Sequence, residues 1–150
     1  MKKKKIYLLL LIGLLFIVGC GKKENVEIKG RMISLSYSYS STDGKYRDYK
    51  MQYTNGVVTV NSYGNDTTTY NATKNVDSTY LDELEKILDK YNVKDWNGFN
   101  EQGSTDEGVG FSLEVGYSDG SNISATGFAE FPEEYDSFKK DLINLFNSIE

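Results

Sequence analysis

The sequence predicts an α+β domain: an antiparallel sheet of about six strands, in the order ββββ-α-ββ-α, with two helices packed on one face. In the first half of the chain, short runs alternate apolar and polar residues and are separated by turn dipeptides. Two later segments instead repeat apolar residues with the period of a helix, and two more alternating runs lie between them. Each helix therefore follows a set of hairpins.

Four strands are expected in the first half of the domain. In Arg31–Ser41 serines alternate with larger residues, so that Tyr37 and Tyr39 continue the apolar face of Ile33 and Leu35. Asn55-Gly56 is the strongest hairpin signal, because both residues accept the positive φ of a tight turn. The four strands are expected over residues 31–41, 46–53, 57–62 and 67–73.

The first helix is expected where the period changes, between Tyr80 and Tyr91. Ser78 or Thr79 can cap its start, with Asp82 three residues after Thr79 as in a capping box. Asn92 is expected to end this helix.

The second half continues with a polar loop over residues 100–108 and two strands over 109–117 and 122–128. The last helix is expected to start at Phe131-Pro132, because proline is tolerated in a first helical turn. Its apolar face is expected to hold Tyr135, Phe138, Leu142, Leu145, Phe146 and Ile149.

Residues 1–19 have the pattern of an export signal. Four lysines precede an apolar run over residues 6–18, which is shorter than the roughly 20 residues that a spanning helix needs. Ile17-Val18-Gly19-Cys20 resembles the lipobox of bacterial lipoproteins. The resemblance implies that the Cys20 thiol carries a diacylglyceryl group and that the signal is cleaved before it. The alternative is an uncleaved N-terminal membrane anchor.

The domain organisation follows from this resemblance. Residues 1–19 are the signal peptide, residues 20–30 are the lipidated cysteine and a polar tether, and residues 31–150 are a single α+β domain. Acyl chains such as palmitate would hold the protein in the lipid bilayer, on the extracytoplasmic side of the cell membrane. Lipidation also explains an unpaired cysteine in an exported chain.

The charge of the chain argues against nucleic acid as a partner. The signal holds four of the 17 lysines and arginines and none of the 22 acids, so residues 20–150 carry 13 bases against 22 acids, a formal charge of −9. A protein that binds nucleic acid needs a basic face.

Few residues are suited to catalysis. The sequence has no histidine, and its one cysteine is assigned to lipid, which excludes the commonest general base, zinc ligand and nucleophile. The carboxylates in turns and loops are Asp95, Glu101, Asp106, Glu107 and Asp119. They match no calcium-binding loop. No catalytic residue, metal or cofactor is therefore expected.

Aromatic residues are the remaining candidates for binding. Trp96 and Phe99 flank an Asn-Gly dipeptide, and Tyr37 and Tyr39 lie in a tyrosine-rich meander. Such rings either form an exposed binding surface or pack into the core. The sequence thus favours a non-enzymatic module that binds a protein or an envelope component. An enzyme-inhibitor or immunity-type lipoprotein acting through residues 92–108 is the alternative, and a small carboxylate-based hydrolase is the least favoured.

The second half also resembles uncharacterised lipoproteins of low-GC Gram-positive bacteria. The resemblance implies a fold and no known activity. It rests on Trp96-Asn97-Gly98-Phe99, Phe111-Ser112-Leu113-Glu114-Val115, Tyr117-Ser118-Asp119-Gly120, Ile123-Ser124-Ala125-Thr126-Gly127 and Phe131-Pro132-Glu133-Glu134-Tyr135.

Overall fold

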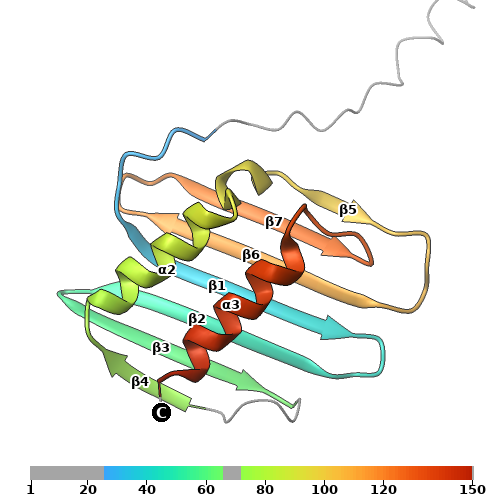
Figure 1. Ribbon diagram of the computed structural model, residues 1–150, viewed down its shortest axis with the longest axis horizontal. Coiled ribbons are helices and arrows are strands. Elements are labelled where there is room, and N and C mark those ends of the chain that lie inside the picture. Colours follow the sequence, from blue (N-terminus) through green and yellow to red (C-terminus); the bar gives the residue numbers. More distant parts are fainter. Residues whose placement is uncertain (1–25, 66–71, 150) are drawn as a thin grey trace, which may run out of the picture.

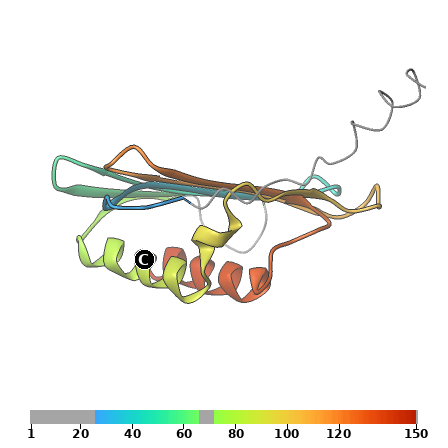
Figure 2. The ribbon, with the colours of Figure 1, turned by 90° about the horizontal axis from the view of Figure 1, so that it is seen from above.

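The computed structural model describes residues 26–65 and 72–149, and it confirms the α+β class. A seven-stranded sheet forms one layer, and two helices form a second layer on one face of it (Figures 1 and 2). The helices are α2 (Thr79–Lys90) and α3 (Tyr135–Asn147), with a short 3-10 helix η1 (Val93–Trp96). The strands are β1 (Met32–Ser41), β2 (Tyr46–Thr54), β3 (Val57–Gly64), β4 (Ala72–Val76), β5 (Asn100–Gln102), β6 (Val109–Tyr117) and β7 (Asn122–Phe128).

The first strand of the chain lies at the centre of the sheet. The order is β4-β3-β2-β1-β6-β7-β5, so β1 pairs antiparallel with β2 on one side and with β6 on the other. The β1–β6 pairing joins the two halves of the chain into one sheet. Residues 34–40 of β1 therefore have neighbours on both sides.

The polar loop expected over residues 100–108 contains a strand. β5 pairs parallel with β7, and Asn100 lies opposite Thr126. All three residues of β5 are exposed and polar, so no alternation of apolar residues marks the strand. Its pairing depends on β7, which is more than twenty residues away in the sequence.

The fourth strand begins outside the region that the structure describes. It was expected over residues 67–73, of which residues 67–71 are not described. β4 continues to Val76, three residues beyond the expected end. It lies at the edge of the sheet beside β3.

The first helix starts at the expected place without the expected side-chain cap, and the last helix starts later than expected. Ser78 occupies the N-cap position of α2 but makes no side-chain hydrogen bond, and Oδ1 of Asp77 instead accepts one from the backbone N–H of Thr79, at 2.8 Å. Hydrogen bonds from the backbone and side chain of Thr79 lower the pKa of Asp77. α3 begins at Tyr135 and not at Phe131, because Glu134 has a left-handed φ of 61° that an α-helix excludes.

The core lies between the sheet and the helices. Tyr37, Tyr49 and Phe138 are among its fully buried side chains. Met32 is also fully buried, whereas Ile33, expected to be in the core, is only half-buried. The register shifts between Met32 and Ser34, and this bulge changes which residue faces the core.

Arg47 is buried on the same face. It lies opposite Tyr39 in the β1–β2 register, and its Nη1 is 3.4 Å from Oγ of Ser62, to which it donates. Gly64 leaves room for it, because a Cβ there would lie 2.8 Å from Nε of Arg47. The glycine at the end of β3 is therefore explained by close packing.

The two helices are tied to one another as well as to the sheet. Oδ2 of Asp141 on α3 accepts hydrogen bonds from Nζ of Lys90 and from the hydroxyl of Tyr91, each at 2.7 Å.

In residues 26–65 and 72–149, no helix has the length and apolar character needed to cross a membrane.

Candidate functional site

The four aromatic candidates lie on the covered side of the sheet or at its edge. Tyr37 is fully buried, and Nζ of Lys139 lies 4.1 Å from the ring centre of half-buried Tyr39. Trp96 packs edge-on against Phe138. Phe99 is half-buried beside Phe111, with ring centres 6.2 Å apart. These rings therefore form no exposed patch. Cys20 lies outside the described residues.

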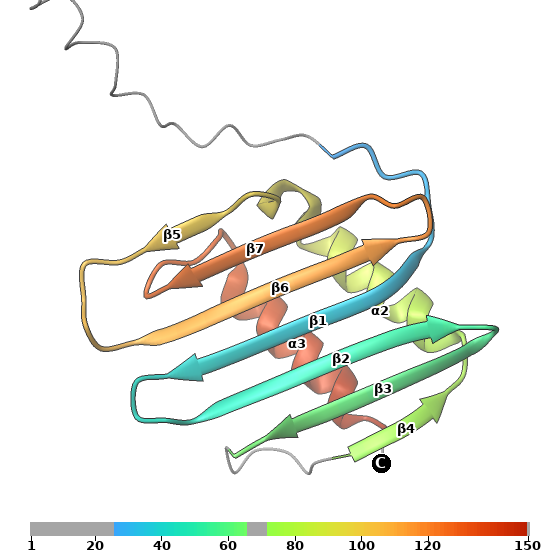
Figure 3. The same cartoon turned by 180° about the vertical axis from the view of Figure 1, so that it is seen from behind.

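The opposite face of the sheet is not covered by α2 or α3 (Figures 2 and 3). Because strand residues alternate between faces, the side chains out of phase with the core residues line it. Ser38 lies between Asp48 of β2 and Ser112 of β6, and Ser36 lies between Lys50 and Glu114. The face is completed largely by Ser34, Ser40, Gln52, Thr59, Asn61, Gly110, Gly116, Ser124 and Thr126. We call this surface the open face.

Two tyrosines lie together at one side of the open face. Tyr63 is 56% exposed, and the ring centres of Tyr46 and Tyr63 are 6.1 Å apart. A hydrogen bond between the two side chains raises the pKa of Tyr46. The sequence spacing indicates which face of the sheet Tyr46 lies on. Tyr46 is three residues from the core residue Tyr49 in the same strand, so its side chain points to the opposite face.

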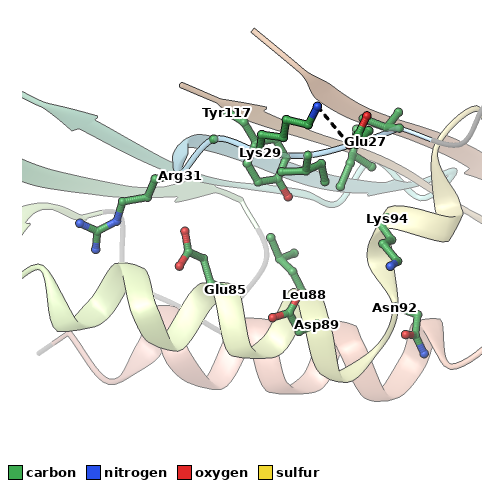
Figure 4. Close-up of a pocket in the computed structure, with 13 residues that line it drawn as sticks. Glu27, Lys29, Arg31, Glu85, Leu88, Asp89, Asn92, Lys94 and Tyr117 are labelled. Atoms are coloured by element: carbon green, nitrogen blue, oxygen red, sulfur yellow. Dashed lines mark ion pairs between the residues drawn. The ribbon is translucent and has the colours of Figure 1, made fainter. Parts of the chain in front are cut away.

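A groove lies on the side of the sheet that the helices cover, between α2 and the segment before β1. Its upper wall is the chain segment Val26–Arg31, and its lower wall is the last half of α2 with the turn that follows (Figure 4). Leu88, Tyr117 and Ile123 lie at its base. The cavity volume is about 910 Å³, which is the size of a typical site for a small organic ligand. We call it the tether groove.

The upper wall is held in place by one carboxylate. Oδ2 of Asp119 accepts the backbone N–H groups of Lys29 and Gly30, at 2.7 and 2.8 Å. Its Oδ1 accepts the N–H and the hydroxyl of Ser121, and these bonds together hold the pKa of Asp119 well below its usual range. A side chain at position 30 would collide with the Asp119 backbone.

The charges along the groove are not equally neutralised. Arg31 pairs with Asp82 at 2.9 Å, and Lys29 pairs with Glu27 at 3.1 Å. Glu85 accepts the N–H of Met32 at 3.1 Å but has no basic partner among the described residues. Tyr117 responds to this environment: burial, followed by the negative charges of Asp89, Glu85 and Asp119, raises its pKa to about 12.

The loop carboxylates stay apart. Asp95, Glu101, Asp106, Glu107 and Asp119 are all exposed. Over residues 26–65 and 72–149, no group of three or more acidic, histidine or cysteine side chains could hold a metal ion. No protein-family model matches the chain, and no curated protein matches its sequence.

Proposed function

We propose that this protein is a lipoprotein anchored through Cys20 to the extracytoplasmic side of the cell membrane, and that it binds a component of the cell envelope without catalysing a reaction. The open face is the proposed binding surface. The observation that carries the proposal is this broad polar face, which the two helices leave uncovered (Figure 3).

The chemistry of the open face favours a glycan over a protein. The centre of a protein interface is usually apolar and aromatic, whereas the centre of the open face is occupied by Ser36, Ser38 and Ser112. Hydroxyl and amide groups can exchange hydrogen bonds with sugar hydroxyls. Tyr46 and Tyr63 add aromatic surface and hydroxyl groups at the side of this area.

A sedimentation assay with purified cell-wall polymer tests the proposal. Residues 20–150 with Cys20 replaced by serine, which removes the lipid site, are mixed with insoluble wall material, and the bound fraction is measured. We expect saturable binding that Ser38→Lys and Tyr63→Ala each weaken about tenfold or more, since one adds bulk and charge and the other removes the exposed ring.

The matched control is Asn144→Lys, which adds the same charge on an exposed position of α3, away from the open face. It should bind like the parent protein. An equal loss for Asn144→Lys and Ser38→Lys would attribute the effect to charge and reject the open face. Absence of binding by the parent protein would reject the envelope polymer.

The alternative function, inhibition of an enzyme through residues 92–108, has less support. An inhibitory loop needs a side chain that projects into its target. Trp96 is buried against Phe138 of α3, and Phe99 is half-buried against Phe111 and Gly127, so both aromatic rings of the segment pack into this protein's own core.

A further inference from the structure

We propose that the tether groove is a binding site for an organic cation that combines an ammonium group with an apolar chain. The inference rests on the groove between Val26–Arg31 and α2 and is independent of the open face. The ligand is expected to place its chain on the base of the groove and its charge against Glu85 and Asp89.

The base of the groove provides the apolar contact. Leu88 and Ile123 are buried at its base, and Ile28 and Tyr117 are half-buried beside them. These four side chains come from three parts of the chain: α2, the β6–β7 hairpin and the segment before β1. An alkyl chain lying on them would be removed from water, which is the main source of affinity for apolar groups.

The walls provide the charge selectivity. The cations of the upper wall are already neutralised, because Lys29 pairs with Glu27 and Arg31 pairs with Asp82. On the lower wall, Glu85 and Asp89 are one helical turn apart and make no ion pair with a described residue. Figure 4 shows both on α2, opposite the segment that carries Lys29 and Arg31.

Tyr117 lines the same groove, and tyrosine rings attract cations. Burial, and then the nearby negative charges of Asp89, Glu85 and Asp119, raise the pKa of Tyr117. Lys94, at the η1 end of the groove, is the opposing charge. Among the described lining residues, two carboxylates and one ammonium make no ion pair, and this balance favours a cation.

The probe is n-hexylamine, which is a cation at pH 7, with n-hexanol and hexanoate as its neutral and anionic counterparts. The titrated protein is residues 20–150 with Cys20 replaced by serine, observed by amide chemical shifts. We expect saturable shifts around Leu88, Tyr117 and Ile123 at millimolar hexylamine, and binding of hexanol and hexanoate at least about tenfold weaker.

Neutral isosteres test the two carboxylates. Glu85→Gln with Asp89→Asn should weaken hexylamine binding about tenfold, and Glu85→Gln keeps an oxygen for the Met32 N–H. Glu83→Gln is the matched control, because Glu83 is exposed on the same helix and does not line the groove. Lys94→Gln should strengthen binding two- to threefold, and it tests the charge argument even if the double variant fails to fold.

Several results would overturn the proposal. Equal binding of hexanol would show a purely apolar site, and tighter binding of hexanoate would show an anion site centred on Lys94. If replacing Lys22 and Lys23 of the chain's own tether by glutamine is required before hexylamine binds, the occupant is the tether and not a separate ligand. Failure of wall-polymer binding would leave the groove proposal untouched.

Discussion

Asp119 accepts four hydrogen bonds although its side chain lies in solvent. Two come from the segment before β1 and two from its own turn. A carboxylate that accepts several N–H groups is stabilised in its charged form, which is why its pKa is lowered. The residue therefore acts as a clamp that holds the upper wall of the tether groove.

Asp119→Asn is expected to open this clamp. One carboxylate oxygen is replaced by an amide that cannot accept, so at pH 7 the amide protons of Lys29 and Gly30 should exchange with solvent about tenfold faster or more. In the parent protein, folding lowers the pKa of the Asp119 carboxyl. The stability that Asp119 contributes to the folded state is therefore complete above the ordinary carboxyl pKa of about 3.9, and it is lost as pH falls through the pKa of the folded state.

Hydrogen exchange followed by NMR measures the exchange rates of the Lys29 and Gly30 amides and how these rates change with pH. Asp43→Ala is the control, because Asp43 holds the β1–β2 turn at the opposite end of the sheet through its own bonds to Lys45. It should not change exchange at Lys29 and Gly30. Unchanged protection in Asp119→Asn would show that the backbone, and not the carboxylate, holds the segment.

Two buried tyrosines should respond in opposite ways to loss of the hydroxyl group. The hydroxyl of Tyr80 is buried with no hydrogen-bond partner in the described residues, so Tyr80→Phe should raise the free energy of unfolding by about 1 kcal/mol. The hydroxyls of Tyr37 and Tyr135 bond to each other at 2.8 Å, so Tyr37→Phe should lower it by about 1–3 kcal/mol.

Urea unfolding measures these free energies. Tyr63→Phe serves as the control, because Tyr63 is exposed and the change should stay within about 0.5 kcal/mol. The variant Tyr37→Phe with Tyr135→Phe should recover much of the loss, since neither hydroxyl is then stranded. Destabilisation by Tyr80→Phe would mean that its hydroxyl does have a partner.

At the scale of elements, β7 depends on a glycine in its interior. A Cβ at position 127 would collide with the carbonyl oxygen of Glu130 and would lie 2.7 Å from the ring of Phe111. Phe99 is the next nearest group, at 3.1 Å. The strand therefore gives up a side chain so that two aromatic rings and a turn can close over it.

Gly127→Ala is expected to lower the free energy of unfolding by about 1–3 kcal/mol, because the packed rings and the backbone would have to move. Gly110→Ala on the adjacent strand β6 is the control. Its Cβ would be 3.4 Å from the nearest atom, in the ring of Phe128, so the loss should be smaller. Equal losses in urea unfolding would indicate a general cost of replacing strand glycines.

Local patterns predicted the elements that have local causes. The alternation in β1 and the apolar stripes of α2 and α3 arise because one face of each element is buried. The bulge near Met32 and the parallel strand β5 depend instead on β6 and β7, which are distant in the sequence. The tether groove was also missed, since its lining residues on α2, on β6 and β7, and in the segment before β1 are distant in the sequence.

At the scale of the whole molecule, the proposed anchor is open to a direct test. A radiolabelled fatty acid should label the parent protein, and Cys20→Ser in the full chain should abolish the label, because no thiol is left to accept lipid. The label and the mass of the parent protein measure this. A parent protein that stays at the unprocessed mass and takes up no label would support an uncleaved N-terminal anchor, and Asp43→Ala should be labelled like the parent.

If Cys20 carries lipid as proposed, the clamp at Asp119 limits how far the domain can stand from a bilayer. With the chain pinned at Lys29 and lipid on Cys20, at most nine residue steps separate them, or about 30 Å when fully extended. A nine-residue strand such as β6 adds a similar length, about 30 Å. Under the proposed anchor at Cys20, any partner of the far loops would therefore lie within about 60 Å of the membrane.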